Sequence, residues 1–149
     1  MATVKGGTLL ARRLGEIAQK LGSDPTLSVG FLEGATYPDG TSVAMVAAIN
    51  EFGAPARNQP PRPFFRNMIA DKSSAWGRAI ADLLDETDYD ATRTLELVGM
   101  GIKGQLQQSI RDLTTPPLKP STVRRKGFDK PLVDTSVMIN SVDYIVERR

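Results

Sequence analysis

Two proline-rich stretches limit what this sequence can fold into. The first, Ala54–Pro63, holds four prolines in ten residues, and the second runs from Thr114 to Lys130. Proline fixes φ and has no backbone N–H, so it interrupts helices and the interior strands of sheets. We therefore expect the first stretch to be an extended loop and the second to be an extended arm, with regular elements elsewhere.

Helix and strand patterns lie outside these stretches. Apolar residues at helical spacing predict helices over Thr8–Leu21, Val43–Phe52, Phe64–Leu84 and Ala91–Leu113. Alternating residues predict strands at Leu27–Phe31 and Val142–Val146, one helical turn is expected at Ser121–Lys126, and Asp134 and Thr135 can cap Ser136–Ser141. The chain has 149 residues, which suggests one domain.

Three glycines interrupt the predicted helix Ala91–Leu113. Gly99, Gly101 and Gly104 each cost about 1 kcal/mol relative to alanine in a helix. This cost suggests close approach of another backbone, and a functional pivot is the alternative.

The composition excludes several kinds of chemistry. The chain has no cysteine and no histidine, so disulfides, thiolate nucleophiles and Cys or His metal sites are excluded, and the commonest general base is missing. No Walker-type loop or Gly-x-Ser-x-Gly motif occurs. No apolar run is long enough to cross a membrane, and the first residues lack the plan of a signal peptide, so we expect a protein made in a cytoplasm.

Charge is unevenly distributed along the chain. Between Ala81 and Glu96 six acidic residues stand against Arg93, and between Lys119 and Lys130 five basic residues stand against Asp129. Helical spacing puts Asp82, Asp85 and Glu86 on one face, where carboxylates can bind a divalent cation or act as acid and base. We favour a patch that faces solvent or a partner. The basic cluster Arg124-Arg125-Lys126 could contact phosphates, but no aromatic residues are interleaved with it to stack on bases.

Three short strings resemble a known family. The first is Ala47–Gly53, which contains Glu51, Phe52 and Gly53, and the second is Pro61–Phe65, which contains Pro63 and Phe64. The third is Lys126–Thr135, followed by Met138, Ser141 and Tyr144, and its motif positions are Pro131, Asp134, Thr135 and Ser141. In this order they resemble the tail-completion and head–tail joining (neck) proteins of tailed bacteriophages, including lambdoid tail components and the minor tail protein Z group. Each string also has a purely structural interpretation, as an anchor and stop, a helix seat or a cap. Ser136 stands where the family often has glycine.

The resemblance implies a fold and a role. The fold would be α+β, a small antiparallel or mixed sheet packed by two to three long helices, with extended proline-rich loops. The protein would be a structural virion protein without cofactor or enzymatic activity, assembled in the bacterial cytoplasm. It would form a hexameric ring at the neck, between the head connector or stopper and the tail terminator or tail tube proteins, with packaged DNA passing through. A tail terminator that caps the tail tube, a carboxylate-based enzyme and a DNA-binding protein are the alternatives.

Candidate interface residues follow from the charges and loops. Arg57 and Arg62 offer donors for carboxylates of a neighbouring subunit, and Phe64 opens the helix that follows their loop. The acidic candidates are Asp82, Asp85 and Glu86, and the basic ones are Lys119, Arg124, Arg125, Lys126 and Lys130. We expect the basic arm to dock on a neighbour, with the acidic stretch of the adjacent subunit as one candidate partner.

Overall fold

The computed structural model describes residues 6–22, 24–127 and 136–148. Its elements in chain order are α1 Gly7–Leu21, β1 Pro25–Phe31, α2 Val43–Phe52, the 3₁₀ turn η1 Pro55–Arg57, α3 Phe64–Glu86, α4 Ala91–Asp112, α5 Pro120–Lys126, α6 Val137–Asn140 and β2 Val142–Arg148. Every predicted helix and strand is present, with α3 running two residues further than the sequence indicated. The α+β fold class is confirmed.

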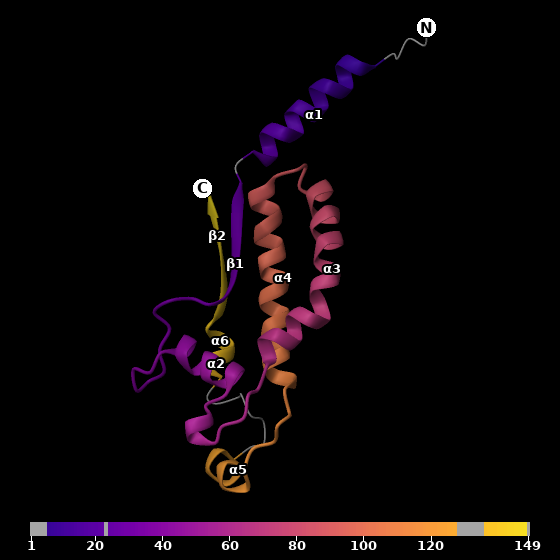
Figure 1. The fold of residues 1–149 in the computed structure, drawn as a ribbon. Helices are drawn as coiled ribbons and strands as arrows, with labels where there is room; N and C mark the ends of the chain where they lie inside the picture. Colours follow the sequence, from indigo (N-terminus) through magenta and orange to yellow (C-terminus); the bar gives the residue numbers. More distant parts are fainter. Residues whose placement is uncertain (1–5, 23, 128–135, 149) are drawn as a thin grey trace.

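The sheet has two antiparallel strands from opposite ends of the chain. β1 pairs with β2 from Pro25 opposite Arg148 to Phe31 opposite Val142. α4 packs against both strands, and α3 packs against the other side of α4 (Figure 1). The α3–α4 turn and α5 lie at opposite ends of the molecule, and α1 projects away beyond the α3–α4 turn (Figure 1).

The core lies at the end of the sheet opposite α1. Its buried apolar residues come from α2, α3, α4, α6 and the start of β2, namely Val43, Ala47, Phe64, Met68, Leu106, Ile110, Met138, Ile139 and Val142. Phe31 meets the Phe64 ring edge-on at 6.1 Å between centroids. Phe64, one of the interface candidates, is only 1% exposed: it stabilises the core and offers a partner almost no surface.

The glycines of α4 have different surroundings. A Cβ on Gly99 would lie 2.6 Å from Tyr144 Cδ2 and 2.8 Å from Leu27 Cδ1, so this glycine lets the sheet approach the helix. The close contact is made by side chains, which corrects the expectation of an approaching backbone. Gly101 and Gly104 have nothing within 4 Å of such a Cβ, and packing does not explain them.

The first proline-rich stretch is more compact than predicted. Pro55 begins the turn η1, Asn58 adopts a left-handed conformation with φ 51°, and Ala54 pairs with Gln59 in an isolated bridge. Proline suits the first position of a helical turn, and asparagine tolerates positive φ, so these residues favour a closed loop over an extended one.

Ser136 precedes α6 with φ 61°. This is the left-handed region that glycine adopts most easily, so a glycine would fit this position without strain. The predicted cap at Asp134 and Thr135 lies outside the described residues, as do Lys130 and Pro131. None of the helices in the described ranges is long and apolar enough to cross a membrane.

Candidate interaction site

Glu51 joins the end of α2 to the start of α3. Its side chain is 7% exposed, and one carboxylate oxygen accepts the backbone N–H of Phe65 at 2.9 Å. The other oxygen accepts the backbone N–H of Arg66 at 3.2 Å and its Nε at 2.8 Å. Pro63, at the N-cap position of α3, has no capping side chain, so Glu51 satisfies the free amides from another helix. The segments Ala47–Gly53 and Pro61–Phe65 therefore meet in one structural junction.

Arg66 completes this junction on the surface. Its Nη2 donates to the Glu51 carbonyl at 3.0 Å, and its guanidinium carbon lies 5.2 Å from the centre of the Phe52 ring. Phe52 is 67% exposed, so it does not anchor α2 in the core, and that interpretation is wrong. Gly53 does end α2: its φ is 77°, and a Cβ there would lie 2.8 Å from Pro61 N. This geometry turns the chain into the proline-rich loop.

The loop then meets the second proline-rich stretch. Together they line a pocket of about 320 Å³ whose cationic side chains are Arg57, Arg62, Lys119 and Arg125. The two stretches were predicted as separate interface elements, and the tertiary structure brings them to one place. Asn50, Gln59 and Thr122 add polar groups to the wall. Sequence reasoning missed these three residues, and no charge or motif marked them.

Arg62 is the unusual member of this pocket. The residue is 8% exposed, and its backbone N–H donates to the Asn50 carbonyl at 2.7 Å. Its Nε is buried and has no hydrogen-bond partner among the described residues. Burial lowers the pKa of the Arg62 guanidinium, because removal from water penalises the charged form.

The acidic stretch lies at the other end of the molecule. Asp82, Asp85 and Glu86 are exposed in the last turns of α3, and none of them forms an ion pair within the described ranges. Asp85 accepts a hydrogen bond from the Tyr89 hydroxyl at 2.7 Å, which raises the pKa of Tyr89. In the part of the chain that the structure describes, no group of three or more acidic residues is placed to hold a metal ion.

Asp88 connects this acidic end to α1. Its carboxylate pairs with Lys20 and, at 3.0 Å, with Arg13 Nη2. These hydrogen bonds, that of Lys20 first, lower the pKa of Asp88. The apolar face of α1 is exposed nonetheless: Leu9 is 65%, Leu10 61% and Leu14 56% exposed, and α1 has no buried residue.

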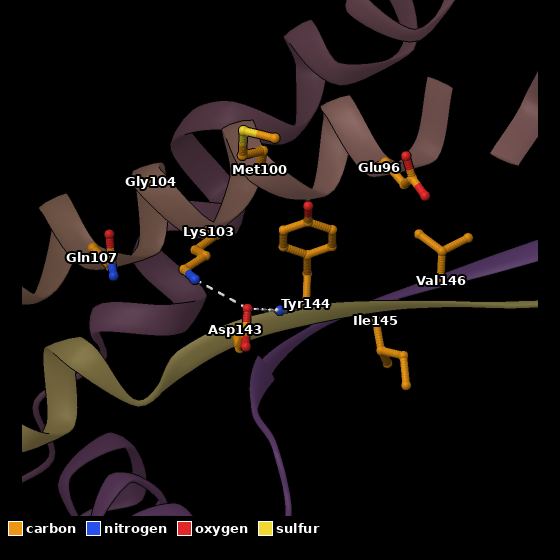
Figure 2. A pocket seen from close by; sticks show the side chains of 9 residues that line it. All are labelled: Glu96, Met100, Lys103, Gly104, Gln107, Asp143, Tyr144, Ile145 and Val146. Carbon is orange, nitrogen blue, oxygen red and sulfur yellow. Dashed lines mark hydrogen bonds and ion pairs between the residues drawn. The ribbon is translucent and has the colours of Figure 1, made fainter. Parts of the chain in front are cut away.

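A second, open pocket lies between α4 and β2. Its volume is about 670 Å³, and Lys103 pairs across it with Asp143 at 3.0 Å (Figure 2). This bond, together with the Tyr144 backbone N–H, lowers the pKa of Asp143. Glu96, also at this pocket, pairs with Arg93 at 3.1 Å. A carboxylate-based enzyme would need a buried pair of carboxylates with perturbed pKa values, and the acids of this pocket are not such a pair.

Of the described residues, the basic candidates Arg57, Lys119, Arg124 and Arg125 are all exposed. Lys126 ends α5, and its side chain lies outside what the structure describes. In and beside α6, Met138 is buried, and the Ser141 hydroxyl donates to the Val137 carbonyl at 2.7 Å. No protein-family model, curated protein or solved structure matches this chain.

Proposed function

We propose that this chain is a ring-forming structural subunit of a tailed bacteriophage. It would complete the tail and join it to the head connector around the DNA channel. The observation that carries the proposal is the separation of charge. The end of α3 that carries the acidic residues lies at the opposite end of the molecule from α5, which helps to line the basic pocket (Figure 1). The resemblance of Ala47–Gly53, Pro61–Phe65 and Lys126–Thr135 to tail-completion and neck proteins is the reason for proposing a bacteriophage particle.

Separated charges of opposite sign suit a head-to-tail ring. A heterologous interface needs two different and complementary surfaces on each subunit, and it closes into a ring when the rotation between subunits allows. Within one copy the acidic end cannot reach the basic end, because α3 and α4 span the distance between them (Figure 1). The two surfaces can therefore pair only between copies, and their charges would steer that encounter.

The exposed leucines of α1 also favour assembly. Leu9, Leu10 and Leu14 are each more than half exposed on one helix. A contiguous apolar patch on a soluble protein commonly marks an interaction surface.

Charge reversal tests the ring. We expect the purified chain to form one closed oligomer by native mass spectrometry, and Arg124→Glu with Arg125→Glu to dissociate it while leaving the circular dichroism spectrum unchanged. Adding Asp85→Lys and Glu86→Lys should restore the oligomer by exchanging the charges of the two faces. The matched control reverses two exposed bases in the middle of α3, Lys72→Glu and Arg78→Glu, and should leave assembly intact.

Other outcomes would contradict the proposal. A chain that stays monomeric at all accessible concentrations is not a ring subunit. If the Arg124 and Arg125 reversals spare the oligomer but abolish binding to duplex DNA, the basic segment contacts DNA instead. Imaging of the particle that contains this chain then tests its location: density at the head–tail junction is expected, density at the end of the tail tube indicates a terminator, and absence from the particle refutes both.

A further inference from the structure

The pocket between the two proline-rich stretches is positively charged, and none of the described residues supplies a counter-charge to it. Arg57, Arg62, Lys119 and Arg125 all line it, and none of its described lining residues is acidic. None of these four side chains takes part in an ion pair within the described ranges. Like charges around one recess repel one another, and a bound anion would lower that repulsion.

Arg62 is the cation in this pocket that would gain most from a bound anion, because it is the most buried. The buried Nε of Arg62 has lost its hydration and has gained no bond from the described residues in exchange. Among residues 6–22, 24–127 and 136–148 nothing bonds to its Nε, although buried polar atoms in folded proteins nearly always have a partner. The lowered pKa of Arg62 has the same physical cause. An oxyanion in the pocket would balance the positive charge of Arg62 and offset the repulsion among the other three cations.

We propose that this pocket is an oxyanion-binding site, and that its occupant in the assembled protein is a carboxylate from the acidic end of a second copy. The site itself needs only the pocket, whereas the choice of occupant rests on the ring function proposed above.

The shape of the site favours a side chain over duplex DNA. The pocket is a recess of about 320 Å³, large enough for one aspartate or glutamate side chain, and its most buried cation is Arg62. The phosphates of a duplex lie along the outside of a wide rod and reach exposed cations more easily than buried ones. The acidic end of α3 provides Asp82, Asp85 and Glu86, which are exposed and have no ion-pair partner in the described part of the chain.

Thermal unfolding with inorganic phosphate tests the site. A ligand that binds only the folded state raises the unfolding midpoint, and we expect a rise of roughly 3 °C or more for the full chain in excess phosphate, against sodium chloride of equal ionic strength. Arg62→Met should fold and lose this rise, because a neutral side chain of similar length replaces the buried cation. Arg78→Met, the same change on the exposed surface of α3, should keep it.

Arg125→Met tests the site even if the Arg62 variant misfolds, because Arg125 is exposed and lines the same pocket from α5. It should reduce the phosphate response without changing the midpoint in chloride. Equal phosphate responses in the chain and in both pocket variants would refute the site.

The occupant is tested separately by self-association at constant ionic strength. Phosphate and Arg62→Met should each weaken the oligomer at least tenfold if a carboxylate of a second copy fills the pocket. An oligomer that responds to neither refutes this occupant but leaves the ring function standing. A chain that binds phosphate but never self-associates keeps the site and refutes the ring. Loss of duplex DNA binding in Arg62→Met, with the oligomer intact, would make the occupant a DNA phosphate and overturn our assignment.

Discussion

Helices α1 and α4 carry similar sequence patterns and have opposite environments. Both present a stripe of leucine and isoleucine at helical spacing. α4 packs on α3, β1 and β2 and buries Val98, Leu106 and Ile110, whereas α1 buries no residue and meets the rest of the molecule through the ion pairs of Asp88. Periodicity thus predicts that a helix forms and which face is apolar, but it does not say whether the same chain covers that face.

Replacing one leucine of each helix by alanine should give the largest difference in the free energy of unfolding. Leu106 is fully buried in α4, and Leu14 is 56% exposed in α1. We expect Leu106→Ala to lower the free energy of unfolding by about 2–5 kcal/mol, because it leaves a cavity in the core. Leu14→Ala should change it by less than about 0.5 kcal/mol in the monomer. Urea denaturation measures both values, and similar losses would show that α1 is as well packed as α4.

Leu14→Ala also separates stability from assembly. If the apolar face of α1 is used between copies, this variant should weaken the oligomer while the monomer unfolds at the same urea concentration. Native mass spectrometry across a dilution series measures the change. An unaltered oligomer would remove α1 from the interface.

Replacing glycines of α4 by alanine should give the next largest changes in the free energy of unfolding, with opposite signs at Gly99 and Gly101. A methyl group on Gly99 would overlap Tyr144 and Leu27, so Gly99→Ala should destabilise the protein by about 1–3 kcal/mol. Gly101→Ala enters open space on the same helix and should stabilise by about 0.5–1 kcal/mol, because alanine has the higher helix propensity. Thermal unfolding distinguishes them, and stabilisation by Gly99→Ala would mean that the sheet does not approach α4 closely.

The smallest expected effect concerns the tether of α1, by which we mean the ion pairs that Lys20 and Arg13 form with Asp88. Lys20 and Arg13 lower the pKa of Asp88, so the ionised carboxylate is favoured in the folded protein. The contribution of this tether is therefore present above the ordinary value of 3.8 and is lost as pH falls through the lowered pKa. We expect α1 to separate from the α3–α4 turn in acid, and to do so at neutral pH in Asp88→Asn.

Fluorescence resonance energy transfer from tryptophan to a label on α1 can follow this separation. Trp76 is the only tryptophan, and the chain has no cysteine, so an acceptor on Gln19→Cys labels α1 alone. Transfer should fall in acid and in Asp88→Asn. Asp82→Asn, at an exposed acid without an ion pair in the described ranges, is the control and should leave it unchanged. Constant transfer in all variants would show that other contacts hold α1.

The candidate site was only partly visible in the sequence. Charge density pointed to Asp85, Glu86, Arg124 and Arg125, which the structure leaves exposed. The role of Glu51 as a cap for α3 was missed, although its position as the one charged residue of the segment Val43–Phe52 was a signal. A lone charge in an apolar helix requires a buried partner or a free helix end, and only tertiary contacts say which.

The sequence by itself determined the local structure of this protein. The periodicity of the apolar residues, the capping residues Ser42 and Asp90, and the glycines that end α2 and α5 place the helices within a few residues. Such signals act between residues close in the chain. Only the tertiary structure decided that Arg62 Nε is buried with no partner among the described residues, that the two proline-rich stretches share one pocket, and that α1 has no buried residue. These properties depend on residues far apart in sequence, because burial and charge environment are set by what packs alongside a segment.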